Sequence, residues 1–173
     1  MLFRSLKEED DKRVASICGM GGLGKTTLAK MVYNHPKVKK HFHYYAWVCI
    51  SEQCQRRPVW EEIMIKLLPQ YKKDQIKEWS DAELVNELRR VQKERECLIV
   101  LDDIWKIEDW NILREVFPIN DTKSKILLTS RYRDVALHVD PRGFHHELHF
   151  LNRQASWKLF EKMALSWRSG TLY

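Results

Sequence analysis

The sequence lacks the features of a secreted or membrane-spanning chain. Its first residues, MLFRSLKEEDDKR, do not contain the apolar stretch of a signal peptide. No window approaches the roughly 18 consecutive apolar residues that a membrane-spanning helix needs. We therefore expect a soluble, cytoplasmic protein with no membrane span.

The sequence also lacks paired cysteine motifs and any long uninterrupted run of charge of one sign. The 4 cysteines form no pair of CxxC motifs of the kind that a structural zinc site uses, so free thiols are expected. Lysine and arginine number 30 against 24 acidic residues, a net charge of +6. The densest basic run, 37–43, is interrupted by Val38 and Phe42 and follows an expected helix end, where cations complement the helix dipole. We expect no nucleic-acid partner.

What the sequence does have is a regular alternation of apolar runs and amphipathic stretches. At 173 residues it is long enough for one α/β domain with a sizeable core. Because strands that alternate with helices pair in parallel, we expect an α/β fold with a five-stranded, mostly parallel sheet flanked by helices. The expected strands are Val14–Cys18, Tyr44–Ile50, Cys97–Leu101, Lys125–Thr129 and Glu147–Phe150. Helices are expected from Lys25, Pro58, Ser80, Trp110, Asp134 and Asn152, and the aromatic residues of the last helix are expected in the core.

A glycine-rich loop follows the first expected strand directly. Residues 19–26, GMGGLGKT, satisfy the phosphate-loop pattern G-x-x-x-x-G-K-[ST]. Such a loop curves its backbone N–H groups around the phosphates of a nucleotide, and the following helix directs its positive end toward them. The lysine then reaches the β- and γ-phosphates, and the threonine hydroxyl contacts Mg²⁺. We therefore expect the α/β fold to be that of a P-loop NTPase. The predicted nucleotide-binding residues are Gly19, Gly21, Gly22, Gly24, Lys25, Thr26 and Thr27.

Two other interpretations of the loop fit the rest of the chain less well. Gly19, Gly21 and Gly24 also match the dinucleotide pattern G-x-G-x-x-G, with Glu52 as a candidate ribose ligand. That pattern does not account for Lys25-Thr26 or for the later pair of aspartates. A protein-kinase glycine loop is disfavoured because no HRD or DFG motif follows.

Polar residues at the ends of two later strands complete the predicted site. Asp102 and Asp103 follow the apolar run 97–101, and we assign Asp102, with Thr26, to Mg²⁺ and Asp103 to activation of the attacking water. Arg131 follows the strand 125–129 and is a candidate sensor of the γ-phosphate. Asp103 and Arg131 are therefore the predicted catalytic residues.

The order of these segments resembles the NB-ARC domain of plant NBS-LRR disease-resistance proteins. The resemblance rests on GMGGLGKTTLAK, HFHYYAWVCIS, CLIVLDDIW, KILLTSR and HELHFLNRQASWKLF, and covers about Val14 to Leu165. Trp105 at the end of CLIVLDDIW resembles the coiled-coil class of these proteins. The resemblance implies a nucleotide-binding subdomain over 14–165, preceded by a charged segment, 1–13, and followed by a frayed tail, 166–173.

The same resemblance implies a molecular switch that rests with ADP, is activated by ATP and is reset by slow hydrolysis. Other immune-signalling proteins would be its partners, and the chain is expected to be a fragment without the ARC, coiled-coil and leucine-rich-repeat parts. Two alternatives stay open at this point. One is a housekeeping P-loop ATPase with sustained turnover, and the other is a remnant that binds no nucleotide and acts through protein contacts.

Overall fold

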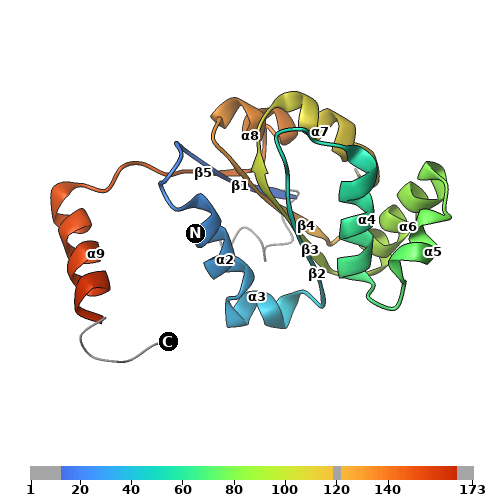
Figure 1. The fold of residues 1–173 in the computed structure, drawn as a ribbon, viewed down its shortest axis with the longest axis horizontal. Coiled ribbons are helices and arrows are strands. Elements are labelled where there is room, and N and C mark those ends of the chain that lie inside the picture. Colours follow the sequence, from blue (N-terminus) through green and yellow to red (C-terminus); the bar gives the residue numbers. More distant parts are fainter. Residues whose placement is uncertain (1–12, 119–121, 167–173) are drawn as a thin grey trace.

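The fold is built on a single parallel sheet (Figure 1). The structure, a computed structural model, describes residues 13–118 and 122–166, so the predicted segments 1–13 and 166–173 lie almost entirely outside it. The strands run in the order β2-β3-β4-β1-β5, and every pair is parallel. Their bounds are β1 Val14–Cys18, β2 Tyr44–Cys49, β3 Cys97–Ile104, β4 Lys125–Ser130 and β5 Phe144–Glu147. The predicted α/β class and five-stranded parallel sheet are confirmed.

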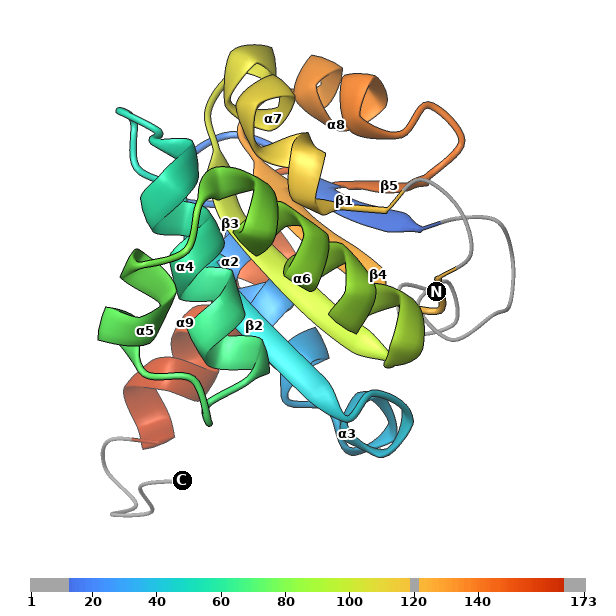
Figure 2. The same cartoon turned by 90° about the vertical axis from the view of Figure 1, so that its right-hand side faces the viewer.

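Helices cover both faces of the sheet (Figure 2). One face packs against α2 (Lys25–Tyr33) and α3 (Pro36–His41). The other face carries α4 (Arg56–Leu67), α5 (Lys73–Lys77), α6 (Asp81–Glu94), α7 (Ile107–Leu113) with the short 3₁₀ turn η1 (Arg114–Val116), and α8 (Arg133–Val139). None of the helices in the described residues is long and apolar enough to cross a membrane.

Strand β3 shows why its sequence is continuously apolar. Leu98 and Val100 pack into the core beneath α2, whereas Ile99 and Leu101 pack into the core beneath α4 and α6. Successive side chains of a strand point to opposite faces, so a strand that is covered on both sides has no position for a polar residue. The apolar run therefore ends only at Asp102, close to the carboxyl end of β3.

Two short helices were not predicted. Helix α3 begins at Pro36, and the Nδ1 atom of His35 accepts a hydrogen bond from the Lys37 backbone N–H at 3.2 Å. Helix α2 does stop before this proline, at Tyr33, but proline is also favoured at the first position of a new helix. Helix α5 lies in the charged stretch 70–79 and is anchored by one fully buried side chain, Ile76.

The predicted fifth strand was misplaced. We expected Glu147–Phe150, whereas β5 is Phe144–Glu147 and pairs with β1 from Ala15 to Cys18. The last contact along this pair is a 2.8 Å hydrogen bond from the Leu148 N–H to the Cys18 carbonyl. Because β1 ends there and turns into the glycine loop at Gly19, the residues after Leu148 have no strand to pair with.

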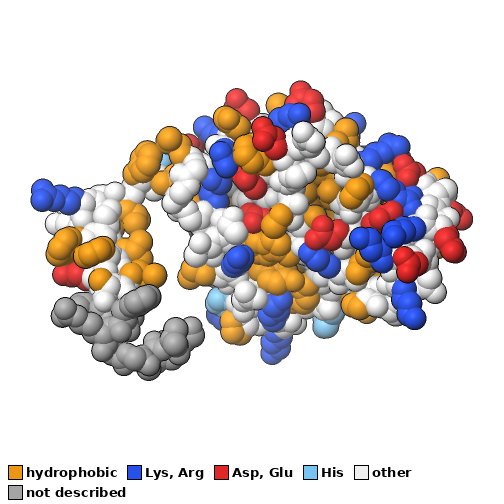
Figure 3. Space-filling view, in the orientation of Figure 1, with side chains coloured by type: hydrophobic (Ala, Val, Ile, Leu, Met, Phe, Trp, Pro, Cys, Tyr) orange, Lys and Arg blue, Asp and Glu red, His pale blue; other side chains and the backbone are white. Residues whose placement is uncertain are grey.

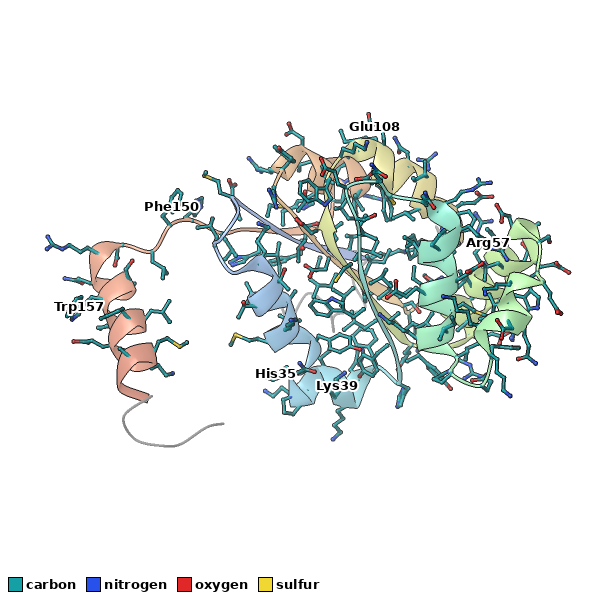
Figure 4. All side chains as sticks on the ribbon, in the orientation of Figure 1. His35, Lys39, Arg57, Glu108, Phe150 and Trp157 are labelled. Atoms are coloured by element: carbon teal, nitrogen blue, oxygen red, sulfur yellow. The ribbon has the colours of Figure 1, made fainter. Side chains whose placement is uncertain are left out.

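The prediction that the last helix packs into the core was wrong. Helix α9 (Arg153–Ser166) forms as expected, with the Asn152 side chain accepting from the Ala155 N–H at 2.8 Å. It stands apart from the sheet, and the labelled Trp157 points away from it (Figures 1 and 4). The apolar period predicted the helix correctly, but a period does not specify which surface covers it. The exposed side chains are Trp157 at 60%, Leu159 at 52%, Phe160 at 61% and Met163 at 65%.

Candidate functional site

The predicted site residues come from three strands that end at the same edge of the sheet. Strand β1 leads into the glycine loop, β3 into the aspartate pair and β4 into Arg131. The register places Ser130 of β4 opposite Cys18 of β1 on one side and Ile104 of β3 on the other. Strand β4 thus separates the glycine loop from the aspartates and places Arg131 between them.

The glycine loop has a backbone that other residues adopt poorly. Gly19 has φ +140°, and a Cβ atom there would stand 2.7 Å from the Leu148 carbonyl oxygen. Gly24 has φ +89° and precedes α2 without any side-chain cap. The N–H groups of the first turn of α2 therefore have no competing acceptor at the cap position, which is the arrangement that favours an anion.

Lys25 lies within the loop rather than in solvent. Lys25 is only 8% exposed, and its ammonium donates a 2.9 Å hydrogen bond to the Met20 carbonyl of the same loop. Burial lowers the pKa of Lys25, and the nearby carboxylate of Asp103 partly offsets this effect. A partly desolvated ammonium attracts phosphate oxygens more strongly than one in water, because there is less solvent to screen it.

Thr26 and Asp102, which the sequence assigned together to Mg²⁺, lie side by side at the carboxyl edge of the sheet. The Thr26 hydroxyl donates to Asp102 Oδ1 at 2.9 Å, although the two residues are 76 positions apart in the chain. Mg²⁺ prefers oxygen ligands about 2.1 Å away in octahedral geometry, which puts adjacent ligand oxygens about 3 Å apart. A hydroxyl and a carboxylate at this spacing fit the ion in donor type and separation. Thr27 lies exposed in the first turn of α2.

Thr129 is a site residue that the sequence analysis missed. It is fully buried on β4, and its hydroxyl donates to Asp102 Oδ1 at 2.6 Å while it accepts from the Asp103 N–H at 2.8 Å. The only signal was a hydroxyl residue near the end of a strand that neighbours the acidic strand. Thr129 orients both aspartates, since it contacts the side chain of one and the backbone of the other.

Asp103 stands in a left-handed conformation that is uncommon for a residue with a side chain. Its φ is +63°, and the pairing of β3 with β4 shifts by one residue between Leu101 and Ile104. Such bulges redirect side chains at the ends of strands. Here the Asp103 carboxylate comes within 3.8 Å of the Arg131 Nε atom.

Arg131 makes a second contact with an aromatic ring. Its guanidinium carbon lies 4.3 Å from the centre of the Trp105 ring. The structure thus places Arg131 close to Asp103 and Lys25. The positive charge of Arg131 also helps to lower the pKa of Lys25. The sequence assigned no role to Trp105 in the site.

Cys18 is the last residue of β1 and adjoins the loop. Burial, with a smaller contribution from Glu147, raises the pKa of its thiol to about 11. A thiol with so high a pKa is almost entirely protonated near neutral pH and is a weak nucleophile. Cys18 is therefore a packing residue at the base of the loop.

A glycine loop that opens a helix, a buried lysine within that loop and a threonine–aspartate pair across a parallel sheet define the P-loop class of nucleotide-binding proteins. Comparison with known families agrees with this class and narrows it. The NB-ARC domain family matches residues 1–170, and the chain belongs to this family.

Similar curated proteins come from Arabidopsis thaliana. One, named as a disease resistance protein, is 50% identical over 156 residues, which is 90% of this chain. The disease resistance RPP8-like protein 3 is 42% identical over 94% of the chain, and the disease resistance protein RPP8 is 40% identical over 98%. The chain spans about 18% of the length of each of these relatives.

Similar solved structures share the fold at low sequence identity. The Drosophila ORC bound to DNA matches with a TM-score of 0.70 and 17% identity, over 96% of this chain and 46% of that one. The Aeropyrum pernix ORC2 protein, solved as ADPNP–ADP complexes, has a TM-score of 0.61 and 17% identity over 88% and 46%. A signal transduction ATPase of Pyrococcus horikoshii with a tetratricopeptide repeat sensor has a TM-score of 0.61 and 18% identity over 90% and 24%. These matches show that the chain shares its fold with these proteins.

Proposed function

We propose that this chain is the ADP- and ATP-binding core of a plant immune receptor and acts as a molecular switch in defence signalling. The observation that carries the proposal is the contact of Thr26 with Asp102 beside the glycine loop, since it joins a phosphate-binding half to a metal-binding half. The disease resistance relatives support the signalling role. The whole receptor would also contain ARC, coiled-coil and leucine-rich-repeat parts. This chain spans only about 18% of the length of its relatives, which leaves those parts outside it.

Within this proposal, different site residues bind different parts of the nucleotide and its metal ion. The backbone of the glycines and of Thr27 holds the phosphates, and Lys25 neutralises the β- and γ-phosphates. Thr26 and Asp102 would hold Mg²⁺, which neutralises phosphate charge when bound. Their hydroxyl and carboxylate oxygens are the ligands this ion prefers.

Asp103 and Arg131 would act on the third phosphate. Asp103 orients the attacking water, and Arg131 pairs with the γ-phosphate oxygens by charge-assisted hydrogen bonds. The γ-phosphate is the only part of ATP that ADP lacks, so a group that contacts it gives the protein different affinities for the two nucleotides. Such a difference is what a nucleotide needs to shift a conformational equilibrium.

The remaining assignments follow from the same proposal. Residues 14–165 form the nucleotide-binding subdomain between the segments 1–13 and 166–173. The protein is cytoplasmic, its small-molecule partner is an adenine nucleotide, and its protein partners are other components of immune signalling. Hydrolysis is slow and resets the switch, so turnover is not the output.

Calorimetric titration of the purified chain with ADP and ATP in the presence of Mg²⁺ tests the proposal. The wild type should bind both nucleotides, and Lys25→Ala should weaken binding at least about tenfold, because a charged hydrogen-bond donor is lost. Lys30→Ala is the matched control, since Lys30 lies exposed on the same helix. Its affinity should equal that of the wild type.

Two results would contradict the proposal in different ways. If the wild type binds neither nucleotide, the chain is a remnant that acts through protein contacts. If it binds ATP but sustains turnover on the order of 1 s⁻¹, and loses that turnover in Asp103→Asn, it is an ordinary ATPase rather than a switch.

A further inference from the structure

The contact between Arg131 and Trp105 has geometry that packing alone does not require. The guanidinium carbon lies 4.3 Å from the ring centre, well inside the distance of about 6 Å at which a cation is attracted to an aromatic face. The Arg131 side chain is 43% exposed, so without this contact it would be free to sample many rotamers. The ring restricts it to one side of the site.

The indole of Trp105 also carries an unsatisfied polar atom. Its Nε1 atom is buried and has no hydrogen-bond partner among the described residues. A buried donor without a partner lowers stability, and phenylalanine would fill much of the same space without it. An indole offers the strongest cation–π attraction of the aromatic side chains. The ring face, rather than the N–H group, therefore accounts for tryptophan at this position.

The backbone that carries the ring is held in place. Asp109, which is 1% exposed, accepts hydrogen bonds from the N–H groups of Trp105 at 3.3 Å and Lys106 at 3.1 Å. These bonds fix the turn between β3 and α7. The ring is consequently a rigid support, whereas the arginine that rests on it has a long, flexible side chain.

The Asp103 carboxylate limits Arg131 from the other side but leaves its donors available. The distance from Arg131 Nε to Asp103 Oδ1 is 3.8 Å, which is an ion pair but too long for a hydrogen bond. A guanidinium has five N–H donors. Held between a ring and a carboxylate, Arg131 keeps these donors for a ligand that is more strongly charged.

We propose that Trp105 is the positioning residue of Arg131, and that it sets the preference of the site for a nucleoside triphosphate over a diphosphate. The proposal rests on the proposed function, because it assigns a cause to the difference between the ATP and ADP affinities of that site. Trp105 does not touch the nucleotide. It lowers the entropy that Arg131 loses on binding the γ-phosphate, so its effect falls on ATP and not on ADP.

The test measures the affinities for ADP and for a non-hydrolysable ATP analogue, with Mg²⁺, in the full chain. Trp105→Leu should lower the ratio of ATP-analogue to ADP affinity about three- to tenfold, as expected for the loss of one cation–π contact. Trp105→Phe keeps an aromatic face and should lose less, with a melting temperature no lower than that of the wild type because the unpaired N–H is gone. If the tryptophan were purely structural, Trp105→Phe would melt at a lower temperature than the wild type, and the ratio of affinities would not change. Trp157→Leu, an exposed tryptophan on α9, should leave the ratio unchanged.

A double-mutant cycle separates positioning from an independent effect. Arg131→Gln removes the cation that rests on the ring, and it should lower the ratio by itself. If Trp105 acts only through Arg131, then Trp105→Leu in the Arg131→Gln background should have no further effect on the ratio. Additive effects would overturn the proposal.

A measurement without nucleotide tests the contact itself. The Nε–Hε signal of Arg131, assigned by its absence in Arg131→Lys, should be shifted upfield by the indole ring current and should return toward the usual position in Trp105→Leu. An unshifted signal in the wild type would overturn the positioning role even if nucleotide binds. If the wild type binds neither nucleotide, both this proposal and the proposed function fail. An unchanged ratio in Trp105→Leu, with binding intact, overturns only this one.

Discussion

At the scale of single residues, the loop glycines are not equivalent. Gly19 combines φ +140° with a close approach to the Leu148 carbonyl, whereas Gly21 has no positive φ and a Cβ there would meet nothing within 4 Å. The motif pattern assigned both to the nucleotide site. The structure shows that Gly19 also permits the crossing of the loop and the chain after β5.

We expect Gly19→Ala to lower the free energy of unfolding by about 1–3 kcal/mol, because alanine adopts this backbone with strain. The added methyl group would also push Leu148 away from the loop. Gly21→Ala is the control and should cost less than about 1 kcal/mol. Urea denaturation of both variants measures the difference, and equal losses would show that the loop tolerates a side chain at either position.

The residues of the site were largely predictable one by one, but not their mutual contacts. Lys25, Thr26 and Asp102 belong to sequence patterns whose chemistry requires them to converge, and the structure brings them together. Thr129 and Trp105 were missed because their roles come from neighbours on other strands. A single sequence contains no information about which residues become such neighbours.

At the scale of secondary-structure elements, α3 is attached to the sheet by an unusual cluster. The Lys39 ammonium lies 3.8 Å from the ring centres of both Tyr33 on α2 and Tyr45 on β2. Tyr33 in turn meets Tyr45 and Trp47 edge to face, at 5.5 Å and 5.4 Å. Figure 4 labels Lys39 on α3. The cluster connects three elements at the edge strand of the sheet.

Lys39→Met should lower the free energy of unfolding by about 0.5–1 kcal/mol, the range for a cation–π contact at an exposed site. Methionine keeps the length and apolar stem of lysine, so the change removes the charge and little else. Lys40→Met, at the next position of the same helix and also exposed, serves as the control. A loss of equal size in both variants would mean that the rings do not stabilise the ammonium.

Element boundaries were predicted less well than element types. Strand β5 was shifted because Leu148 and Phe150 continue an alternating pattern after pairing with β1 has ended. Helices α3 and α5 are shorter than two turns, so they contain too few residues for a hydrophobic period to be visible. Both errors arise because the extent of an element depends on the partner it packs against.

At the scale of the whole molecule, α9 leaves apolar surface uncovered. Figure 3 shows hydrophobic side chains on α9, apart from the mixed surface that covers the sheet and its helices. Trp157 and Phe160 contact each other, with ring centres 5.7 Å apart, and both are more than half exposed. Contiguous apolar surface of this kind promotes self-association.

Truncation after Asn152 should leave the melting temperature within about 2 °C of the full chain, because the apolar residues of α9 bury little surface. It should also reduce self-association at high concentration, as measured by light scattering. The double substitution Trp157→Gln/Phe160→Gln, which retains the helix, should have the same effect on scattering. A large fall in melting temperature on truncation would show that α9 supports the sheet.

The strand order also has a consequence for how the protein is made. Strand β1 pairs only with β4 and β5 among the described strands, and Val14 lies opposite Ile126, 112 residues later in the chain (126 − 14). At ribosomal rates of about 5–20 residues per second, β1 and the glycine loop are synthesised roughly 6–20 s before β4, the strand that pairs with β1. During that interval β2 and β3 can already pair with each other, since β3 emerges before β4. The nascent chain therefore exposes an apolar strand and an unformed phosphate loop, and its yield in the cell should depend on chaperones that shield β1 until β4 arrives.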